Sequence, residues 1–163
     1  MKIHKMTAAH WVAVSKIYAE GIATGFATFE KSVPSYENWD KAHLGNCRIV
    51  VLSQNTVLGW AALSPVSNRC VYGGVAEVSV YVGQDYTGKG VGTLLLQQLI
   101  LASEKEELWT IQSGIFPENI ASIVLHEKAG FRYIGKRERV GQLDGVWKDN
   151  LLFERRSKTV GIN

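Results

Sequence analysis

The chain has few cysteines, few prolines and no long apolar run. Its 163 residues include two cysteines, Cys47 and Cys70, and three prolines. The cysteines are far apart and lack C-x-x-C spacing, which argues against a disulfide framework and favours a reduced, cytoplasmic protein. No apolar run reaches the roughly 18 residues of a membrane-spanning helix, and the first residues, MKIHKMTAAHW, contain no apolar signal core. We therefore expect no membrane partner.

An excess of one charge is also lacking. Lys and Arg number 18 against 15 Asp and Glu, a net charge of +3. No basic stripe with interleaved aromatics is present, and the KRER run at 136–139 is short enough to be a solvated strand end. We therefore expect no nucleic-acid partner. His4, His10 and His43 form no ligand spacing with the cysteines, so we expect no metal site.

The rest of the composition is that of an ordinary globular protein, with 46% hydrophobic and 20% charged residues, which predicts one domain over residues 1–163. Hydrophobic periodicity predicts two helices, then a run of strands, then the order β-α-β-α-β-β. Expected helices cover about 7–24, a short segment after 34–35, 90–105 and 119–129; expected strands cover 48–52, 56–63, 75–82, 108–115, 132–136 and 148–155. This order predicts an α+β, or mixed α/β, domain around one twisted sheet.

A glycine-rich loop is the most informative feature that is present. Residues 81–93 read YVGQDYTGKGVGT, between a β-rich run and a leucine-rich helix. Backbone N–H groups at such a helix start can converge on a phosphate or pyrophosphate. A Walker loop needs Ser or Thr after its lysine, but Gly90 follows Lys89, and the spacing does not match the dinucleotide fingerprint G-x-G-x-x-G. Taken alone, the loop is a weak signal, and a tight strand-to-helix turn without a ligand is the alternative.

Three segments together resemble the GCN5-related N-acetyltransferase (GNAT) superfamily. They are the strand AEVSVYV (76–82), the loop TGKGVG (87–92) and the helix NIASIVLHEKAGF (119–131). The segments at 17–30 (IYAEGIATGFATFE), 77–82, 117–131 and 146–149 (VWKD) resemble, more narrowly, the phosphinothricin/methionine sulfone N-acetyltransferase family. One departure is Thr87, which stands where the superfamily loop usually has Gln or Arg.

The resemblance implies a fold and a function. The expected fold is the acyl-CoA N-acyltransferase fold, a twisted mixed sheet flanked by helices. The expected protein is a cytoplasmic homodimer that uses acetyl-CoA, without a metal, to acetylate the α-amino group of a small amino acid such as phosphinothricin, methionine sulfone or methionine sulfoximine. Resistance to an antibiotic or herbicide of that type is an expected role. Another amine (a polyamine, an aminoglycoside or a protein N-terminus) and a catalytically silent acyl-CoA-binding regulator remain the alternatives.

The resemblance also implies the residues that bind the cofactor. The glycine loop would bind the pyrophosphate through backbone amides, which Cβ atoms would obstruct. The strand before it would pair its backbone with the pantetheine arm and polarise the thioester carbonyl. The expected cofactor-binding residues are Val80, Tyr81, Val82, Gly88, Lys89, Gly90, Val91, Gly92, Thr93, Asn119 and Ser122.

Two residues are candidates for catalysis. Glu77 lies among apolar residues, where burial would raise its pKa, and it could take the proton from the substrate ammonium group. The alternative for Glu77 is a carboxylate paired with a lysine or arginine. His126 stands where most superfamily members have Tyr and could protonate the departing thiolate. A structural histidine, a donor at Tyr81 or Tyr133, or a thiolate that leaves without an acid are the alternatives to His126.

The substrate pocket is predicted from residue chemistry. An α-carboxylate favours a forked donor, and Arg69 is the candidate, with simple surface solvation as its alternative. Aromatic and polar residues after the first helix would form the wall, with core packing as the alternative for the aromatic ones. The expected substrate-binding residues are Phe26, Thr28, Phe29, Glu30, Arg69, Tyr72 and Glu77, with Trp147 as a further aromatic candidate.

Overall fold

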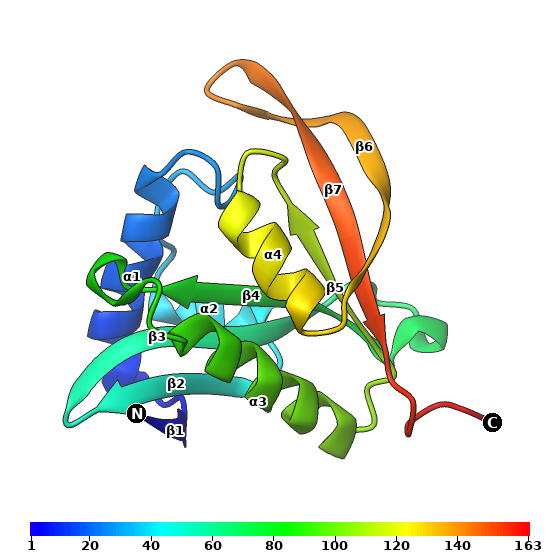
Figure 1. Cartoon of the computed structure of the whole chain (residues 1–163), viewed down its shortest axis with the longest axis horizontal. Coiled ribbons are helices and arrows are strands. Elements are labelled where there is room, and N and C mark those ends of the chain that lie inside the picture. The colour runs from blue at the N-terminus through cyan, green and yellow to red at the C-terminus, as the bar shows by residue number, and fades with distance from the viewer.

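A single seven-stranded sheet organises the chain (Figure 1). In this computed structural model, which describes residues 1–163, the sheet has the order β1-β2-β3-β4-β5-β7-β6. All neighbouring strands are antiparallel except β4 and β5, which are parallel. The strands are β1 (Lys2–Lys5), β2 (Arg48–Ser53), β3 (Thr56–Pro65), β4 (Val75–Val82), β5 (Thr110–Ile115), β6 (Arg132–Leu143) and β7 (Val146–Arg156). The expected mixed α/β architecture is confirmed.

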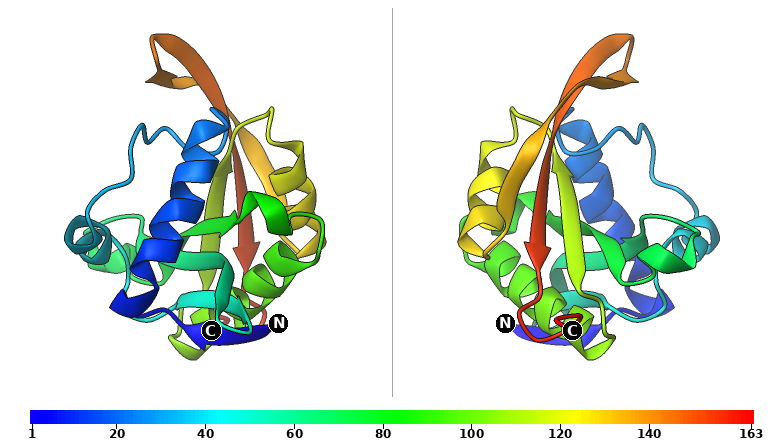
Figure 2. Two further views of the ribbon diagram at one scale, coloured as in Figure 1. Left: turned by 90° about the vertical axis from the view of Figure 1, so that its left-hand side faces the viewer. Right: turned by 90° about the vertical axis from the view of Figure 1, so that its right-hand side faces the viewer.

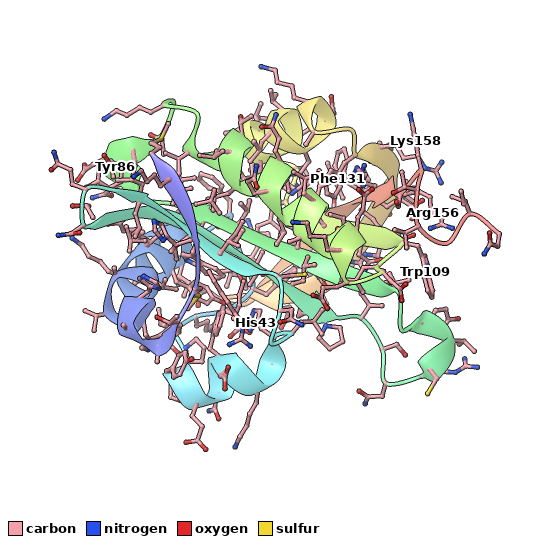
Figure 3. The ribbon with its side chains drawn as sticks, turned by 90° about the horizontal axis from the view of Figure 1, so that it is seen from below. His43, Tyr86, Trp109, Phe131, Arg156 and Lys158 are labelled. Atoms are coloured by element: carbon pink, nitrogen blue, oxygen red, sulfur yellow. The ribbon has the colours of Figure 1, made fainter.

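Four α-helices cover both faces of the sheet. Helices α3 (Val91–Lys105) and α4 (Ile120–Lys128) lie on one face, and α1 (Trp11–Ala23) and α2 (Tyr36–Ala42) lie on the other (Figure 2). Short 3₁₀ turns lie at 8–10, 70–72 and 84–86. Seen from below, α3 runs between the neighbourhoods of Tyr86 and Trp109, and His43 at the end of α2 lies across the sheet from it (Figure 3). The sheet thus has a buried core on each face.

Helix α3 forms where the sequence pattern predicts it. Its buried residues Leu95, Leu96 and Leu99 are spaced so that they share one stripe, which packs on β2, β3 and β4. Gly90, with φ of 84°, is the N-cap, a left-handed conformation that glycine adopts without steric cost. The helix therefore begins directly after the glycine loop, so that the N–H groups of the loop lie next to those of the first turn of α3.

Strands β4 and β5 separate after a short parallel ladder, and this separation opens the molecule. Their pairing extends only from Val75↔Thr110 to Glu77↔Gln112. On its other edge, β4 pairs with β3 as far as Val82. Beyond Glu77, the edge of β4 that faces β5 therefore has no partner strand, and its backbone N–H and C=O groups are free for a ligand. The two strands diverge toward their carboxyl ends (Figure 1).

The structure differs from the predicted elements at the N-terminus and in the last hairpin. Strand β1 was not expected, because KIHK is short and shows no apolar alternation; it is added at the edge by pairing with β2. Strand β6 extends beyond the predicted 132–136 as far as Leu143. A register shift between Arg137 and Gly141 marks a bulge, and the tip is formed by Asp144 and Gly145, both at positive φ. Asp-Gly is a dipeptide favoured in two-residue hairpin turns.

Candidate active site between the separated strands

A cavity of about 690 Å³ lies where β4 and β5 diverge. Its wall combines the free edge of β4, the glycine loop, the first turns of α4, residues of the loop after α1, and the inner side of the β6–β7 hairpin. A cavity of this size lies in the range of cofactor and small-molecule sites. It brings together segments that are far apart in the sequence.

The glycine loop places free backbone amides at one end of this cavity, an arrangement called the cradle below. Gly88 and Gly90 have φ of 72° and 84°, which turn successive amides in the same direction. The N–H groups of residues 88–93 donate no hydrogen bond within the chain, and the first backbone bond of the helix runs from Leu94 N to Gly90 O at 3.0 Å. Unpaired amides at the positive end of the α3 dipole fit a pyrophosphate.

The side chains around the loop play smaller parts. Thr87 lines the cavity, and its hydroxyl donates to the Gln84 carbonyl at 3.2 Å. Lys89 does not line the cavity; its ammonium donates to the Asp85 carbonyl at 2.9 Å and lies over the Tyr86 ring. The cradle is therefore built from backbone groups, so the absence of Gln or Arg at position 87 leaves it intact.

Helix α4 brings Asn119, Ser122 and His126 to the cavity wall. Asn119 is the N-cap, and its Oδ1 accepts from Ser122 N at 3.3 Å. His126 is 1% exposed, and its Nδ1 lies 2.7 Å from the Ser122 carbonyl, so Nδ1 carries the proton. Nε2 is buried without a partner and is an acceptor. Burial lowers the pKa of His126, with the Ser122 carbonyl opposing, so the ring is neutral near pH 7 and has no proton to give from Nε2.

Glu77 occupies the last paired position of β4 before the strands separate. Val78 belongs to the core on the α3 face, so Glu77 points to the opposite face, where it borders the cavity. Solvent in the cavity reaches its side chain, but the surrounding protein still removes much of its hydration. This desolvation raises the pKa of Glu77, and the positive charge of Arg137 partly opposes the rise.

Aromatic residues form the wall next to Glu77. The Tyr81 ring stacks on Trp60 with centroids 4.9 Å apart and lies at the same distance from Tyr18. Burial raises the pKa of Tyr81, so its phenol keeps its proton. Phe29 meets Phe116 edge to face at 4.7 Å. Phe26 and Thr28, from the same loop, also line the cavity.

Four residues that the sequence suggested for the pocket do not line this cavity. Arg69 and Tyr72 lie together on the surface, with the guanidinium 5.5 Å from the ring centroid. Glu30 lies outside the wall, although its charge contributes to the raised pKa of Tyr81. Trp147 is 57% exposed on the projecting hairpin. Within one chain, these four residues therefore lie outside the wall of this cavity.

Among the wall residues that sequence reasoning missed are an arginine and an amide that bear on the chemistry, Arg137 and Asn150. They are opposite each other on β6 and β7, and Arg137 Nη2 donates to Asn150 Oδ1 at 2.9 Å. Arg137 lies in the KRER run, which had been assigned to a solvated strand end. The D-G turn at 144–145 was the one available signal, because a hairpin centred there would pair the two segments.

Two general findings complete the description of the site. The structure contains no group of three or more His, Cys, Asp or Glu side chains that could hold a metal ion. None of its helices combines the length and apolarity needed to cross a membrane.

Comparisons with known proteins agree with this geometry. Residues 11–131 match the model of the Acetyltransferase (GNAT) family. Over 99 residues the chain is 36% identical to a phosphinothricin N-acetyltransferase of Streptomyces coelicolor, a match that spans 61% of this chain and 58% of the relative. Over 93 residues it is 40% identical to an L-methionine sulfoximine/L-methionine sulfone acetyltransferase of Pseudomonas paraeruginosa, spanning 57% of this chain and 54% of the relative. The matches thus span just over half the length of these two relatives.

A solved structure extends the likeness to nearly the whole chain. The Salmonella typhimurium acetyltransferase yncA, solved with its cofactor acetyl-CoA, superposes with a TM-score of 0.87 at 27% identity, over 95% of this chain and 92% of that one. The family model covers most of the chain, from α1 to the end of α4, and includes both the glycine loop and the Asn119 helix. The chain therefore belongs to the acetyltransferase (GNAT) family.

Proposed function

We propose that this protein is an acetyl-CoA-dependent N-acetyltransferase that acts on the α-amino group of a small amino acid of the phosphinothricin, methionine sulfone or methionine sulfoximine type. The observation that carries the proposal is the position of Glu77. It is the only acidic residue in the cavity wall, and it lies where β4 loses its partner strand, on the strand that leads to the glycine cradle. A base at this point lies between the cofactor site and the substrate site.

The residues present fit acetyl-CoA. The free amides of 88–93 suit its pyrophosphate, and the unpaired edge of β4 at 80–82 suits its pantetheine arm. The buried Nε2 of His126 lacks a partner and could accept a hydrogen bond from a bound ligand. When bound, acetyl-CoA supplies the acetyl group as a thioester. Asn119 and Ser122 would hold the start of α4 against it.

Glu77 would act as the base of the reaction. An amine attacks only after it has lost the proton of its ammonium form, and the Glu77 carboxylate would accept that proton directly or through water. The raised pKa of Glu77 makes the carboxylate a stronger base than an exposed glutamate. The backbone N–H groups of β4 would polarise the carbonyl that the amine attacks. The N–C bond forms, the C–S bond breaks, and the sulfur keeps the electron pair.

The protonation states of the residues in the cavity wall indicate which of them could give a proton to the departing sulfur. Neutral His126 carries its proton on Nδ1, which already donates to the Ser122 carbonyl. Tyr81 keeps its phenolic proton and lines the cavity, whereas Tyr133 does not line it. The raised pKa also makes the Tyr81 phenol a weak acid. We therefore favour departure as the thiolate, with Tyr81 as the other donor considered, over His126. His126 would instead orient the ligand by accepting a hydrogen bond.

The substrate class is supported by the aromatic wall formed by Phe26, Phe29 and Tyr81, which would enclose a short side chain. Resistance to a toxic amino acid is a role that such a substrate would support. The hairpin of β6 and β7 projects from the rest of the molecule (Figure 2). A homodimer is part of the proposal, because Val140, Val146 and Trp147 on this hairpin expose apolar surface. The unpaired Cys47 and Cys70 support a reducing cytoplasmic setting. Light scattering, which measures the mass of the protein in solution, tests the homodimer. The mass of a monomer at micromolar concentration would contradict it.

Thiol release from acetyl-CoA, measured against a panel of amines and amino acids, tests the function. We expect turnover with methionine sulfone or phosphinothricin, and we expect Glu77→Gln to lower kcat by about 10²- to 10⁴-fold, the range of general base catalysis. The affinity for CoA should stay unchanged, because Glu77 is not part of the cradle. Turnover by Glu77→Gln at the wild-type rate would remove the base role. Tight CoA binding with no turnover of any amine would instead indicate a silent acyl-CoA-binding regulator.

A further inference from the structure

Arg137 is the only lysine or arginine in the wall of the cavity, just as Glu77 is the only acid. Other arginines of the fold are already engaged. Arg48 is buried and bound to Asp40 and to the carbonyls of Leu44 and His43, and Arg155 pairs with Glu104 at 3.1 Å. The guanidinium of Arg137 makes a single hydrogen bond within the chain, which leaves most of its five N–H donors free. A forked cation with free donors in a cavity is a site for a planar anion.

Asn150 holds the guanidinium in place. Its side chain is 5% exposed and lies against Gly114 of β5, where an added Cβ would come within 2.6 Å of Oδ1. The close approach of Gly114 gives Asn150 the room to accept from Arg137 Nη2 at 2.9 Å. On β6, the bulge between Arg137 and Gly141 changes the course of the strand directly after the arginine. The position of Arg137 is therefore supported by the packing of two other strands.

Glu77 and Arg137 face the same space without forming an ion pair. The positive charge of Arg137 acts on Glu77, yet neither residue takes part in any ion pair within 4.0 Å. A carboxylate and a guanidinium that stand apart in one cavity leave room between them for a molecule with the opposite arrangement of charge. An α-amino acid is such a molecule, because a single carbon joins its ammonium and carboxylate groups.

We propose that Arg137, oriented by Asn150, binds the carboxylate of an α-amino acid substrate whose amino group faces Glu77. This inference rests on the proposed function and names the group that selects the substrate. It makes Arg137 a specificity residue and Asn150 a positioning residue, and it assigns to Arg137 the role that sequence reasoning gave to Arg69. Amines that lack a carboxylate, such as polyamines, would leave the guanidinium unpaired and be poor substrates.

The test compares three substrates that differ at one group: methionine sulfone, its carboxamide, and the matching primary amine without the carboxylate. Wild type should prefer methionine sulfone over the amine. Arg137→Gln should lower kcat/KM for methionine sulfone by about 10- to 100-fold, the expected loss for a charge-assisted hydrogen bond, mainly through KM. For the primary amine, kcat/KM of Arg137→Gln should stay within about twofold of the wild-type value, when each protein is measured at its own optimal pH. Arg132→Gln, on the same strand but with an exposed side chain that pairs with Glu154, is the matched control.

Two further variants and a binding measurement keep the test independent of folding and turnover. Arg137→Lys keeps the charge and should restore part of the preference for the carboxylate. Asn150→Ala should raise KM for methionine sulfone with little change in kcat, because it frees the arginine without removing it. Calorimetry on the CoA-loaded protein should detect methionine sulfone binding to wild type and to Arg132→Gln, and little or none to Arg137→Gln.

Several results would overturn the inference. One is an equal loss of kcat/KM for all three substrates in Arg137→Gln, which would mean that Arg137 acts only through its charge on Glu77. A second is a carboxylate preference that is lost in Arg69→Gln but retained in Arg137→Gln. Wild type that acetylates the amine but not methionine sulfone would overturn the inference while N-acetyltransferase activity stands. If wild type turns over no amine, the proposed function fails, and calorimetry alone then decides whether Arg137 binds the carboxylate.

Discussion

Glu77 shows how one side chain depends on its surroundings for its chemistry. An exposed glutamate is ionised and weakly basic near neutral pH, but the partial desolvation of Glu77 raises its pKa. Arg137 limits that rise, so the two residues together set the pH at which the carboxylate is free to accept a proton. His126 illustrates the opposite direction, since burial lowers its pKa and keeps it neutral. Residue type alone specifies neither state.

The pH dependence of kcat/KM follows from this arrangement. The base form of Glu77 is the deprotonated form, so the rate should rise with pH through the raised pKa of Glu77 and reach a plateau above it. Arg137→Gln removes the charge that lowers this pKa, so the acidic limb should move to higher pH. Stopped-flow or steady-state rates with the amine lacking a carboxylate would measure the shift. A limb that moves to lower pH, or one that persists in Glu77→Gln, would contradict the assignment.

At the scale of elements, the turn into α3 combines a backbone requirement with the proposed binding of acetyl-CoA. Gly90 caps the helix at a φ of 84°, a conformation that costs other residues roughly 1–2 kcal/mol. No heavy atom lies within 4 Å of an added Cβ there, so the cost of a substitution comes from backbone strain and not from a clash. The amides of the cradle depend on the same conformation for their direction.

Gly90→Ala should therefore weaken the binding of acetyl-CoA more than it weakens the fold. We expect a loss of stability of about 1 kcal/mol, because of the left-handed φ, and a KM for acetyl-CoA raised by roughly tenfold, since one misdirected amide is worth a hydrogen bond to a charged group. Thermal unfolding and acetyl-CoA titration would measure the two effects. Gly45→Ala, also in open space but without a positive φ, is the control. Equal acetyl-CoA KM values in the two variants would argue against the cradle.

At the scale of the whole molecule, the sheet separates two cores and supports the cavity between its halves. Leu95 is fully buried in the core on the α3 face, against strands that also position Glu77. Leu95→Ala should lower the free energy of unfolding by about 2–5 kcal/mol, the range for a buried leucine. Leu101→Ala, on the same helix but 51% exposed, should change it by less than about 0.5 kcal/mol. Urea denaturation measures both, and similar losses in the two variants would contradict this packing.

Much of the fold and part of the site follow from local patterns. The alternation in β4, the leucine stripe of α3 and the Asn119 cap are short-range signals, and the structure has each element where its pattern predicts it. Phe26, Thr28, Phe29, Glu77 and most of the predicted cofactor residues line one cavity. Arg69, predicted as a forked donor just before β4 in the sequence, and Tyr72, predicted as an aromatic wall residue near it, lie on the surface beside the 3₁₀ turn at 70–72 and outside the cavity wall.

The sequence by itself determined the conformations that depend on a few neighbouring residues: the glycine turn, the helix that follows it and the strand that carries Glu77. Its motifs were enough to indicate the family. Only the tertiary structure decided that β4 and β5 separate, and that Arg137 and Asn150 meet Glu77 across the resulting cavity. The physical reason is that helix caps and turns are formed by local contacts, whereas these three residues are brought together by the ladders of β4 with β5, of β5 with β7 and of β7 with β6. No short segment encodes such long-range pairing.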